Sequence, residues 1–135
     1  MSLLSAGPIV VGRVASGHVS ISVTDRSSEG WLSGYARCRS GPFSGSCRVS
    51  FYQGELRRFV SDVEKLYRGL VGTVQLSPME PFLEMTLTGN GRGLIVAEGT
   101  ARESFVDGIH LSFRIDFDQT DLPSIIAALR LADPA

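Results

Sequence analysis

The sequence predicts an α+β fold built mainly from antiparallel strands, with two helices. Three observations predict it. Short segments alternate apolar and polar residues, 15 glycines and 6 prolines separate them, and two longer segments carry apolar residues at spacings of three and four. A period of two is typical of a half-buried strand, and spacings of three and four are typical of an amphipathic helix. We expect about seven or eight strands in a sandwich or half-open barrel, since short links favour antiparallel neighbours.

Four strands are predicted in the first part of the chain. The apolar run 9–14 is expected to form an edge strand, and valine and isoleucine alternate with serine in 18–23. The segment 31–39 alternates clearly, and Ser40-Gly41-Pro42 predicts the turn that follows it. The next strand, 47–52, places its apolar residues on one side.

Two helices are predicted, at about 54–69 and about 121–132. We expect the first to act as a crossover that packs on a sheet face and to end at Gly69 or Gly72. We expect Asp121 to cap the second helix. The apolar stripe of the first helix comprises Leu56, Phe59, Val60, Val63, Leu66, Tyr67 and Leu70. The buried face of the second comprises Leu122, Ile125, Ile126 and Leu129.

The strands of the second part are predicted at 71–76, 82–88, 94–98 and 109–117. The glycine-rich segment 89–93 predicts a hairpin loop, because Asn-Gly supplies positive φ at little cost. The last strand has the longest alternating set, with Ile109, Leu111, Phe113, Ile115 and Phe117 on its apolar side.

Composition limits the classes of protein to consider. The 135 residues suit a single domain over 1–135, and 43% hydrophobic with 20% charged residues indicates a folded chain. A net charge of -1 disfavours direct binding of nucleic acid. The sequence has no pattern of a signal peptide and no apolar stretch near the length of a membrane span. We therefore expect a cytoplasmic protein with reduced thiols and no membrane association.

The imidazole and thiol groups do not predict an active site. A catalytic His110 would need Asp107 or Asp116 as partner, but no nucleophile stands beside it in the pattern. Cys47 shares a face with apolar residues, and Cys38 is similarly placed, so both are interpreted as core residues.

The acidic and glycine-rich segments do not predict a cofactor or metal site either. Asp116, Asp118 and Asp121 could attract a hard cation but lack the glycine and distal glutamate of a calcium loop. The segment 89–93 continues as a strand, whereas a phosphate-binding loop needs a helix after it. We predict a non-catalytic protein with no catalytic, metal-binding or cofactor-binding residues.

The exposed polar faces instead predict binding of a protein partner. Arginines lie beside aromatic residues around the 31–52 hairpin. This composition is found in interface hot spots and also in sites that bind single-stranded nucleic acid. A tryptophan in the core with arginines in solvent would explain it equally. Acidic strand residues would complement a basic partner. The candidate partner-binding residues are Trp31, Tyr35, Arg37, Glu84, His110, Arg114, Asp116 and Asp118.

Five segments in order carry a resemblance to a known family. They are Trp31–Arg37 with Phe43–Ser46, Glu55–Phe59, Met79–Leu83, Leu87–Gly93 and Asp118–Pro123. Together, over roughly residues 30 to 132, they resemble the WapI-type immunity proteins and their uncharacterised bacterial relatives. The resemblance implies a small cytosolic partner that neutralises a contact-dependent toxin, often a tRNA-cleaving nuclease, without a cofactor. Leu32 departs from the pattern where an aromatic residue is expected, and Cys47 where a larger apolar residue is expected.

The sequence thus predicts a binding protein that neutralises a polymorphic or contact-dependent bacterial toxin. The alternative is a small-ligand-binding β domain that uses the concave side of a curved sheet. An enzyme comes third and would need a buried, pKa-shifted cluster around His110.

Overall fold

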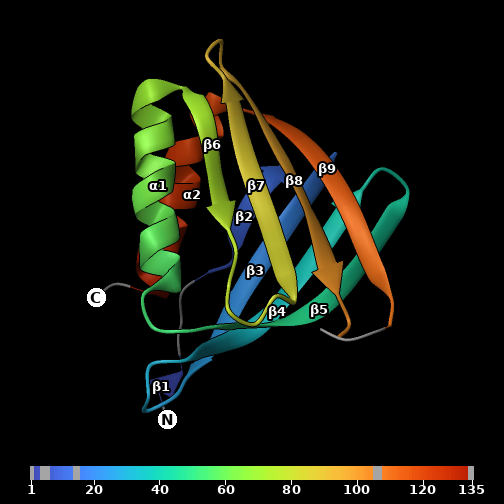
Figure 1. The fold of residues 1–135 in the computed structure, drawn as a ribbon, viewed down its shortest axis with the longest axis vertical. Coiled ribbons are helices and arrows are strands. Elements are labelled where there is room, and N and C mark those ends of the chain that lie inside the picture. Colours follow the sequence, from blue (N-terminus) through green and yellow to red (C-terminus); the bar gives the residue numbers. More distant parts are fainter. Residues whose placement is uncertain (1, 4–6, 14–15, 105–107, 134–135) are drawn as a thin grey trace.

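Two antiparallel sheets pack face to face in the computed structural model, which describes residues 2–3, 7–13, 16–104 and 108–133 (Figure 1). The first sheet comprises β1 (Ser2–Leu3), β2 (Ile9–Arg13), β3 (Gly17–Arg26), β4 (Leu32–Ser40) and β5 (Phe43–Phe51). The second comprises β6 (Val71–Leu76), β7 (Leu83–Asn90), β8 (Leu94–Arg102) and β9 (His110–Asp118). The helices are α1 (Glu55–Gly69) and α2 (Leu122–Ala132), with a 3-10 turn at Gln119–Asp121 before α2.

Both sheets are simple meanders, which confirms the predicted antiparallel α+β fold. The first sheet runs β1-β3-β4-β5 with β2 also paired to β3, and the second runs β6-β7-β8-β9. β2 therefore lies at an edge, as expected. One expectation was wrong: α1 does not cross over within a sheet but leads from the last strand of the first sheet to the first strand of the second.

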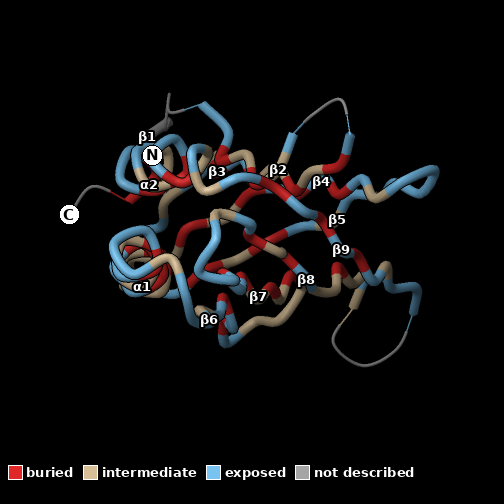
Figure 2. Tube along the Cα trace, turned by 90° about the horizontal axis from the view of Figure 1, so that it is seen from above, coloured by how far each residue is buried: buried red, intermediate tan, exposed pale blue. Residues whose placement is uncertain are grey.

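One continuous core fills the space between the layers. The inward side chains of both sheets are buried, and the two helices lie side by side at one side of the sandwich (Figure 2). Leu56, Phe59 and Val63 of α1 are at most 2% exposed. Each such buried side chain stabilises the fold by about 1.5–3 kcal/mol relative to exposure. This burial explains why the helix period of three and four predicts α1 so well.

Contacts from other parts of the chain hold both ends of α1. Gly54 precedes it without a side-chain cap, and the backbone N–H of Tyr52 donates to the Glu55 carboxylate instead. The last residue of α1 is Gly69, as predicted, and the residue that follows in the left-handed region is Leu70, with φ 62°. The reason is tertiary: the backbone N–H of Gly91 in the β7–β8 hairpin donates to the Leu70 carbonyl at 2.8 Å. A hydrogen bond from the β7–β8 hairpin thus helps to hold Leu70 in a left-handed conformation that usually requires glycine.

Three side chains of the predicted apolar faces lie further out than expected. Tyr67 of α1 is 44% exposed, and Ile126 of α2 is only partly buried. Ile109 is 79% exposed because β9 begins one residue later, at His110. The remaining members of that strand's apolar set, from Leu111 to Phe117, face the core.

The start of α2 corrects another prediction. Asp121 stands at the N-cap position but makes no capping hydrogen bond, and it pairs with Arg13 at 3.4 Å. The capping role falls to Asp118, whose carboxylate accepts from the Thr120 backbone N–H at 2.9 Å. The 3-10 turn moves the first unsatisfied amide three residues upstream, so the sequence pattern misplaces the cap.

Candidate partner-binding surfaces

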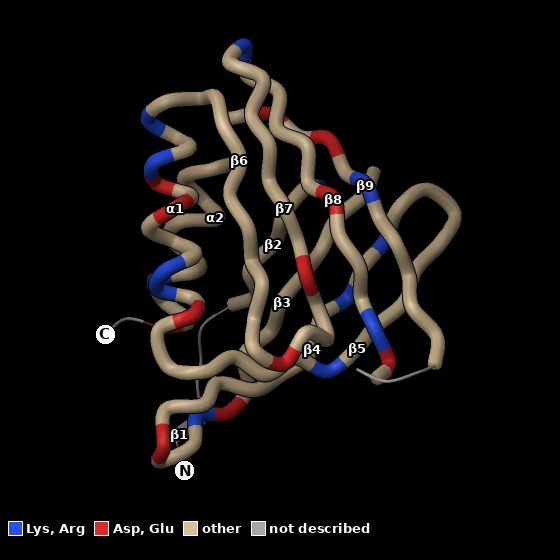
Figure 3. The backbone as a smooth tube through the Cα atoms, in the orientation of Figure 1, with Lys and Arg blue, Asp and Glu red and all other residues tan. Residues whose placement is uncertain are grey.

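The outer face of the second sheet gathers five of the eight predicted partner-binding residues. Because successive side chains of a strand point to opposite faces, the inward apolar residues of β7 to β9 leave their polar neighbours outward. The five residues are Glu84, His110, Arg114, Asp116 and Asp118. Acidic and basic positions are interspersed across these strands (Figure 3). The prediction missed Glu98 and Arg102, which alternation in β8 with Ile95 and Ala97 places on the same face.

Ion pairs hold part of this face. Arg102 lies 3.3 Å from Glu84, and Arg114 lies 3.7 Å from Asp116. These pairs are largely exposed, so each contributes little to stability. Hydrogen bonds from Thr120 lower the pKa of the Asp118 carboxyl, which therefore stays ionised. The face carries threonines and mixed charges, with acidic groups in excess.

The other three predicted residues lie on the opposite side of the sandwich. Tyr35 and Arg37 point outward from β4, and Tyr35 is 61% exposed. Trp31 lies just before β4 and packs edge-on against Tyr52, with ring centroids 5.0 Å apart. Arg48, also outward, lies over the Phe82 ring at 5.9 Å. The structure thus separates the predicted set into two faces that one flat partner cannot cover together.

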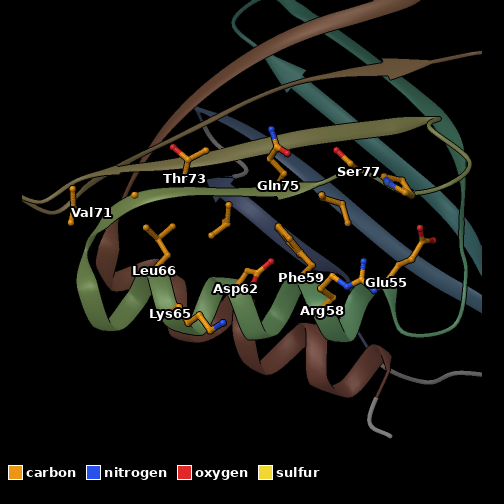
Figure 4. A pocket seen from close by; sticks show the side chains of 14 residues that line it. Glu55, Arg58, Phe59, Asp62, Lys65, Leu66, Val71, Thr73, Gln75 and Ser77 are labelled. Carbon is orange, nitrogen blue, oxygen red and sulfur yellow. The ribbon is translucent and has the colours of Figure 1, made fainter.

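A third surface, which the sequence prediction missed, is a groove between α1 and β6 (Figure 4). Its volume is about 570 Å³, within the size range of ligand sites. One wall is the helix and the other is the edge of β6. The helix wall includes Arg58, Asp62 and Lys65, and the strand wall includes Thr73 and Gln75.

The side chains of this groove are not equally available. Glu55, at one end, accepts hydrogen bonds from the backbone N–H groups of Tyr52 and Met79, so it fixes two loops. The Thr73 hydroxyl lies 3.4 Å from that of Thr88 on the neighbouring strand, and the side chains of Asp62 and Gln75 line the groove beside it (Figure 4). A signal for this groove existed in the sequence: an amphipathic helix is followed immediately by a strand with no charged residue.

Comparison with protein families decides the lineage. A model of the Immunity protein WapI-like family matches residues 13–132, which is most of the chain. The chain belongs to this family. The resemblance found in the sequence is therefore confirmed. Immunity proteins generally act by binding a protein toxin and not by catalysis, so the WapI-like assignment supports a protein partner.

Solved structures add support for the fold alone. A chain from the crystal structures of Trypanosoma bruciei MRP1/MRP2 is similar to this WapI-like protein with a TM-score of 0.54 and 14% sequence identity. The similarity covers 97% of this chain and 84% of that chain. No curated protein matches the sequence. Neither described helix is long and apolar enough to cross a membrane.

A hollow near His110 is where this WapI-like protein would have to hold an active site. It has a volume of about 370 Å³ and is lined by Cys47, Glu103 and His110 among others. Burial raises the pKa of the Cys47 thiol, whereas a nucleophilic cysteine needs a lowered pKa. The Glu103 carboxylate accepts from the backbone N–H of Ile109. Asp107, the other suggested partner of His110, lies outside the described residues.

The three aspartates weighed as a cation site in the WapI-like chain each have a separate partner. Asp116 pairs with Arg114, Asp118 caps the 3-10 turn, and Asp121 pairs with Arg13. Over the part of the chain that the structure describes, no group of three or more His, Cys, Asp or Glu residues could hold a metal ion.

Proposed function

We propose that this WapI-like protein is a non-catalytic cytoplasmic partner that neutralises a polymorphic or contact-dependent bacterial toxin. The family supports binding of a protein toxin. The exposed strand faces supply the kind of surface that covers a partner's active region. The same assignment favours binding over chemistry as the means of neutralisation.

We further propose that the toxin is a nuclease and contacts the outer face of the second sheet. The observation that carries this is the group of four outward carboxylates, on Glu84, Glu98, Asp116 and Asp118. A nuclease must present a basic surface to its polyanionic substrate. Complementary charge speeds association and fixes orientation more than it adds affinity. A carboxylate-bearing sheet face therefore suits the role of occluding such a surface.

Charge reversal on this face tests the proposal. The probe is a catalytically inactive form of the toxin domain encoded beside the gene, measured by surface plasmon resonance at several salt concentrations. The test variant is Asp116→Lys combined with Asp118→Asn, because an asparagine oxygen can still accept from Thr120. We expect association to slow by roughly tenfold at low salt and the difference to shrink as salt rises.

The control carries a charge reversal elsewhere. Glu29 is exposed in the loop between β3 and β4, which are strands of the first sheet. Glu29→Lys changes the net charge in the same direction as the test variant. Its association rate should stay close to wild type. Equal slowing by both variants would indicate general attraction, and no slowing by the test variant would remove this face as the interface. Absence of any binding would reject the toxin proposal.

A second candidate function, binding of a small apolar ligand, has one observation in its favour. The space between the sheets is filled by core side chains, so the expected concave site is occupied. A hollow of about 660 Å³ between the helices, lined by Tyr67, Ile126 and Leu131, remains for it. In a thermal-shift screen of small hydrophobic compounds, a compound that binds should raise the Tm of wild type and not that of Ala127→Trp, in which the tryptophan fills the hollow. If no compound raises the Tm of wild type, this function is rejected.

A further inference from the structure

The edge of β6 is open on the side of the groove. β6 stands at the end of the second sheet, and its strand ladder within the described residues is formed with β7 alone. In an antiparallel pair, backbone groups point alternately toward the neighbouring strand and away from it. Every second N–H and C=O of Val71–Leu76 therefore points into the groove. Such a row is a template for another strand.

The sequence of β6 lacks two of the features that usually protect an edge strand, and the third, a covering segment, is supplied by α1 beyond the groove. Natural edges are blocked by charged side chains, proline or covering segments. The sequence of β6, Val-Gly-Thr-Val-Gln-Leu, contains neither a charge nor a proline. The opposite edge strand of the same sheet, β9, carries Arg114, Asp116 and Asp118 on its outer face. The second sheet thus has charged side chains on one edge strand, β9, and none on the other, β6.

A helix also lies against the corresponding edge of the first sheet. There α2 packs on β2, as α1 does on β6. The inward side chains are buried in both strands: Ile9 and Val11 of β2 are at most 1% exposed, and Leu76 of β6 is 2% exposed. The Arg13–Asp121 ion pair also joins β2 to the start of α2. The groove of about 570 Å³ lies at the α1–β6 pair.

We propose that the α1–β6 groove binds an extended segment of the toxin, which adds to β6 as a further strand of the second sheet. This proposal rests on the proposed function and specifies a contact for it. The strand wall supplies backbone hydrogen bonds, and the helix wall contacts the side chains of the segment. Thr73 and Gln75 belong both to the groove and to the outer face of the sheet, so the segment continues the proposed interface.

The shape and charge of the groove select this occupant. α1 runs beside the open edge, so a single extended chain fits, while a second copy would bring its own α1 against this one. The helix wall carries Arg58 and Lys65 on either side of Asp62. The segment is therefore expected to place a carboxylate opposite Arg58 or Lys65. The uncharged strand wall sets no charge requirement of its own.

Proline substitution tests the backbone part of the proposal. Of two consecutive residues, one N–H faces β7 and the other faces the groove, so Thr73→Pro and Val74→Pro form a matched pair. The variant that breaks the β7 ladder will lose thermal stability. The variant that stays close to wild-type stability has lost the groove-facing N–H together with its own side chain, and we expect it to bind the inactive toxin domain roughly tenfold more weakly.

A charge pair on α1 tests the other wall. Lys65→Glu reverses a charge in the groove, whereas Arg68→Glu reverses one on the same helix that lies outside it. We expect weaker toxin binding for Lys65→Glu alone. Hydrogen exchange gives an independent readout: toxin binding should slow alternate amides of Val71–Leu76, as strand addition requires.

The outcomes separate this proposal from the proposed function. If the toxin binds wild type and the stable proline variant equally and leaves the exchange of β6 unchanged, the groove proposal is wrong and toxin binding stands.

If wild type binds no toxin, the proposed function fails, and the groove is tested with phage-displayed random dodecapeptides. Enrichment on wild type but not on the stable proline variant supports the groove, and no enrichment overturns it. A dimer by light scattering that the proline variant abolishes would assign the edge to a second copy and overturn it as well.

Discussion

The two halves of the molecule repeat one plan. The first half runs β2-β3-β4-β5-α1 and the second runs β6-β7-β8-β9-α2, each as a four-stranded meander followed by a helix. Each helix packs on the first strand of the other half, α1 on β6 and α2 on β2. The inner faces of the two sheets form one core, and each half supplies a helix that packs on the other half. Neither meander could bury its apolar face alone.

Glycine positions show how deep the correspondence goes. Gly34 of β4 and Gly99 of β8 lie at equivalent places, opposite Val23 and Met85 in their sheets. A Cβ at Gly34 would lie 1.8 Å from the carbonyl oxygen of Ser22, and one at Gly99 would lie 2.0 Å from that of Glu84. Both strands therefore approach their neighbour more closely than any side chain allows.

The difference between the halves is what bears on function. Equivalent constraints shape the interior of both sheets, while the helix–strand seams differ: the Arg13–Asp121 ion pair joins β2 to the start of α2, and a groove of about 570 Å³ lies between α1 and β6. Features needed for folding are shared by the halves, so a feature found in only one of them is a better indicator of binding. The predictions that follow test the shared features first and then those specific to one half.

The largest effect is expected at the two equivalent glycines. Gly34→Ala and Gly99→Ala each force a methyl group into backbone that cannot move aside as a side chain would. Each should lower the free energy of unfolding by about 3 kcal/mol or more, and the two losses should be similar, as measured by urea denaturation. A variant that fails to express in folded form agrees with this expectation.

Gly69→Ala is the control, because nothing lies within 4 Å of the added Cβ at this last position of α1. It should raise stability by roughly 0.5–1 kcal/mol, as alanine is the better helix former. A large loss at Gly34 with none at Gly99 would show that the halves do not share this constraint and would break the comparison.

A smaller loss is expected at Asp133, which follows α2 and joins this end of the chain to β3 and α1. Its buried carboxylate lies 3.0 Å from Arg26 of β3 and 3.3 Å from Arg57 of α1. Asp133→Asn leaves both guanidinium groups without their anion. Because these arginines are partly exposed, we expect a loss of about 2 kcal/mol, less than for a fully buried pair. Hydrogen exchange should quicken in β2 and not in β6.

Glu64→Gln serves as the matched control for Asp133→Asn. It removes the carboxylate partner of Arg130, whose side chain is 59% exposed. Such a surface pair contributes at most about 1 kcal/mol, so stability should change little. Equal losses from the two variants, or faster exchange in β6 than in β2, would contradict this role of Asp133.

The sequence predicted the elements because local periodicity follows burial directly. The alternation of β9 from Leu111 to Phe117 and the stripe from Leu56 to Leu66 both report which residues face the core. The helix boundaries were also close, apart from the cap at Asp118 and the turn at Leu70. Those two depend on a 3-10 turn and on a hairpin from elsewhere in the chain, which no local pattern contains.

The candidate surfaces were predicted only in part, for a related reason. Alternation identifies outward residues such as Tyr35 and Asp116, but not whether two strands belong to one sheet. The predicted set therefore mixed residues of two opposite faces. The groove depends on which strand edge stays unpaired, and Asp133 depends on arginines more than 70 residues away. The groove and the ion pairs of Asp133 both depend on contacts between distant parts of the chain, which the local spacing of residues in the sequence does not predict.

The last prediction concerns the thiols, which occur in the first half alone. Cys38 is 1% exposed, and burial, with a smaller contribution from Cys47, raises the pKa of its thiol from 9.0 to about 12. Above pH 9 the unfolded chain loses this proton while the folded chain keeps it, so the folded state binds more protons. The free energy of unfolding should then fall by about 1 kcal/mol per pH unit between pH 9 and 12.

Other groups also titrate in this range, so the comparison is made with Cys38→Ala, which removes the thiol from the same buried position. Urea denaturation of both proteins from pH 8 to pH 10.5 should give a shallower decline for the variant. Parallel declines would mean that the Cys38 thiol is as free to ionise in the folded chain as in the unfolded one. In that case the inner face of the first half would be open to water, unlike the inner face of the second half, and the two halves would differ in their cores as well as in their seams.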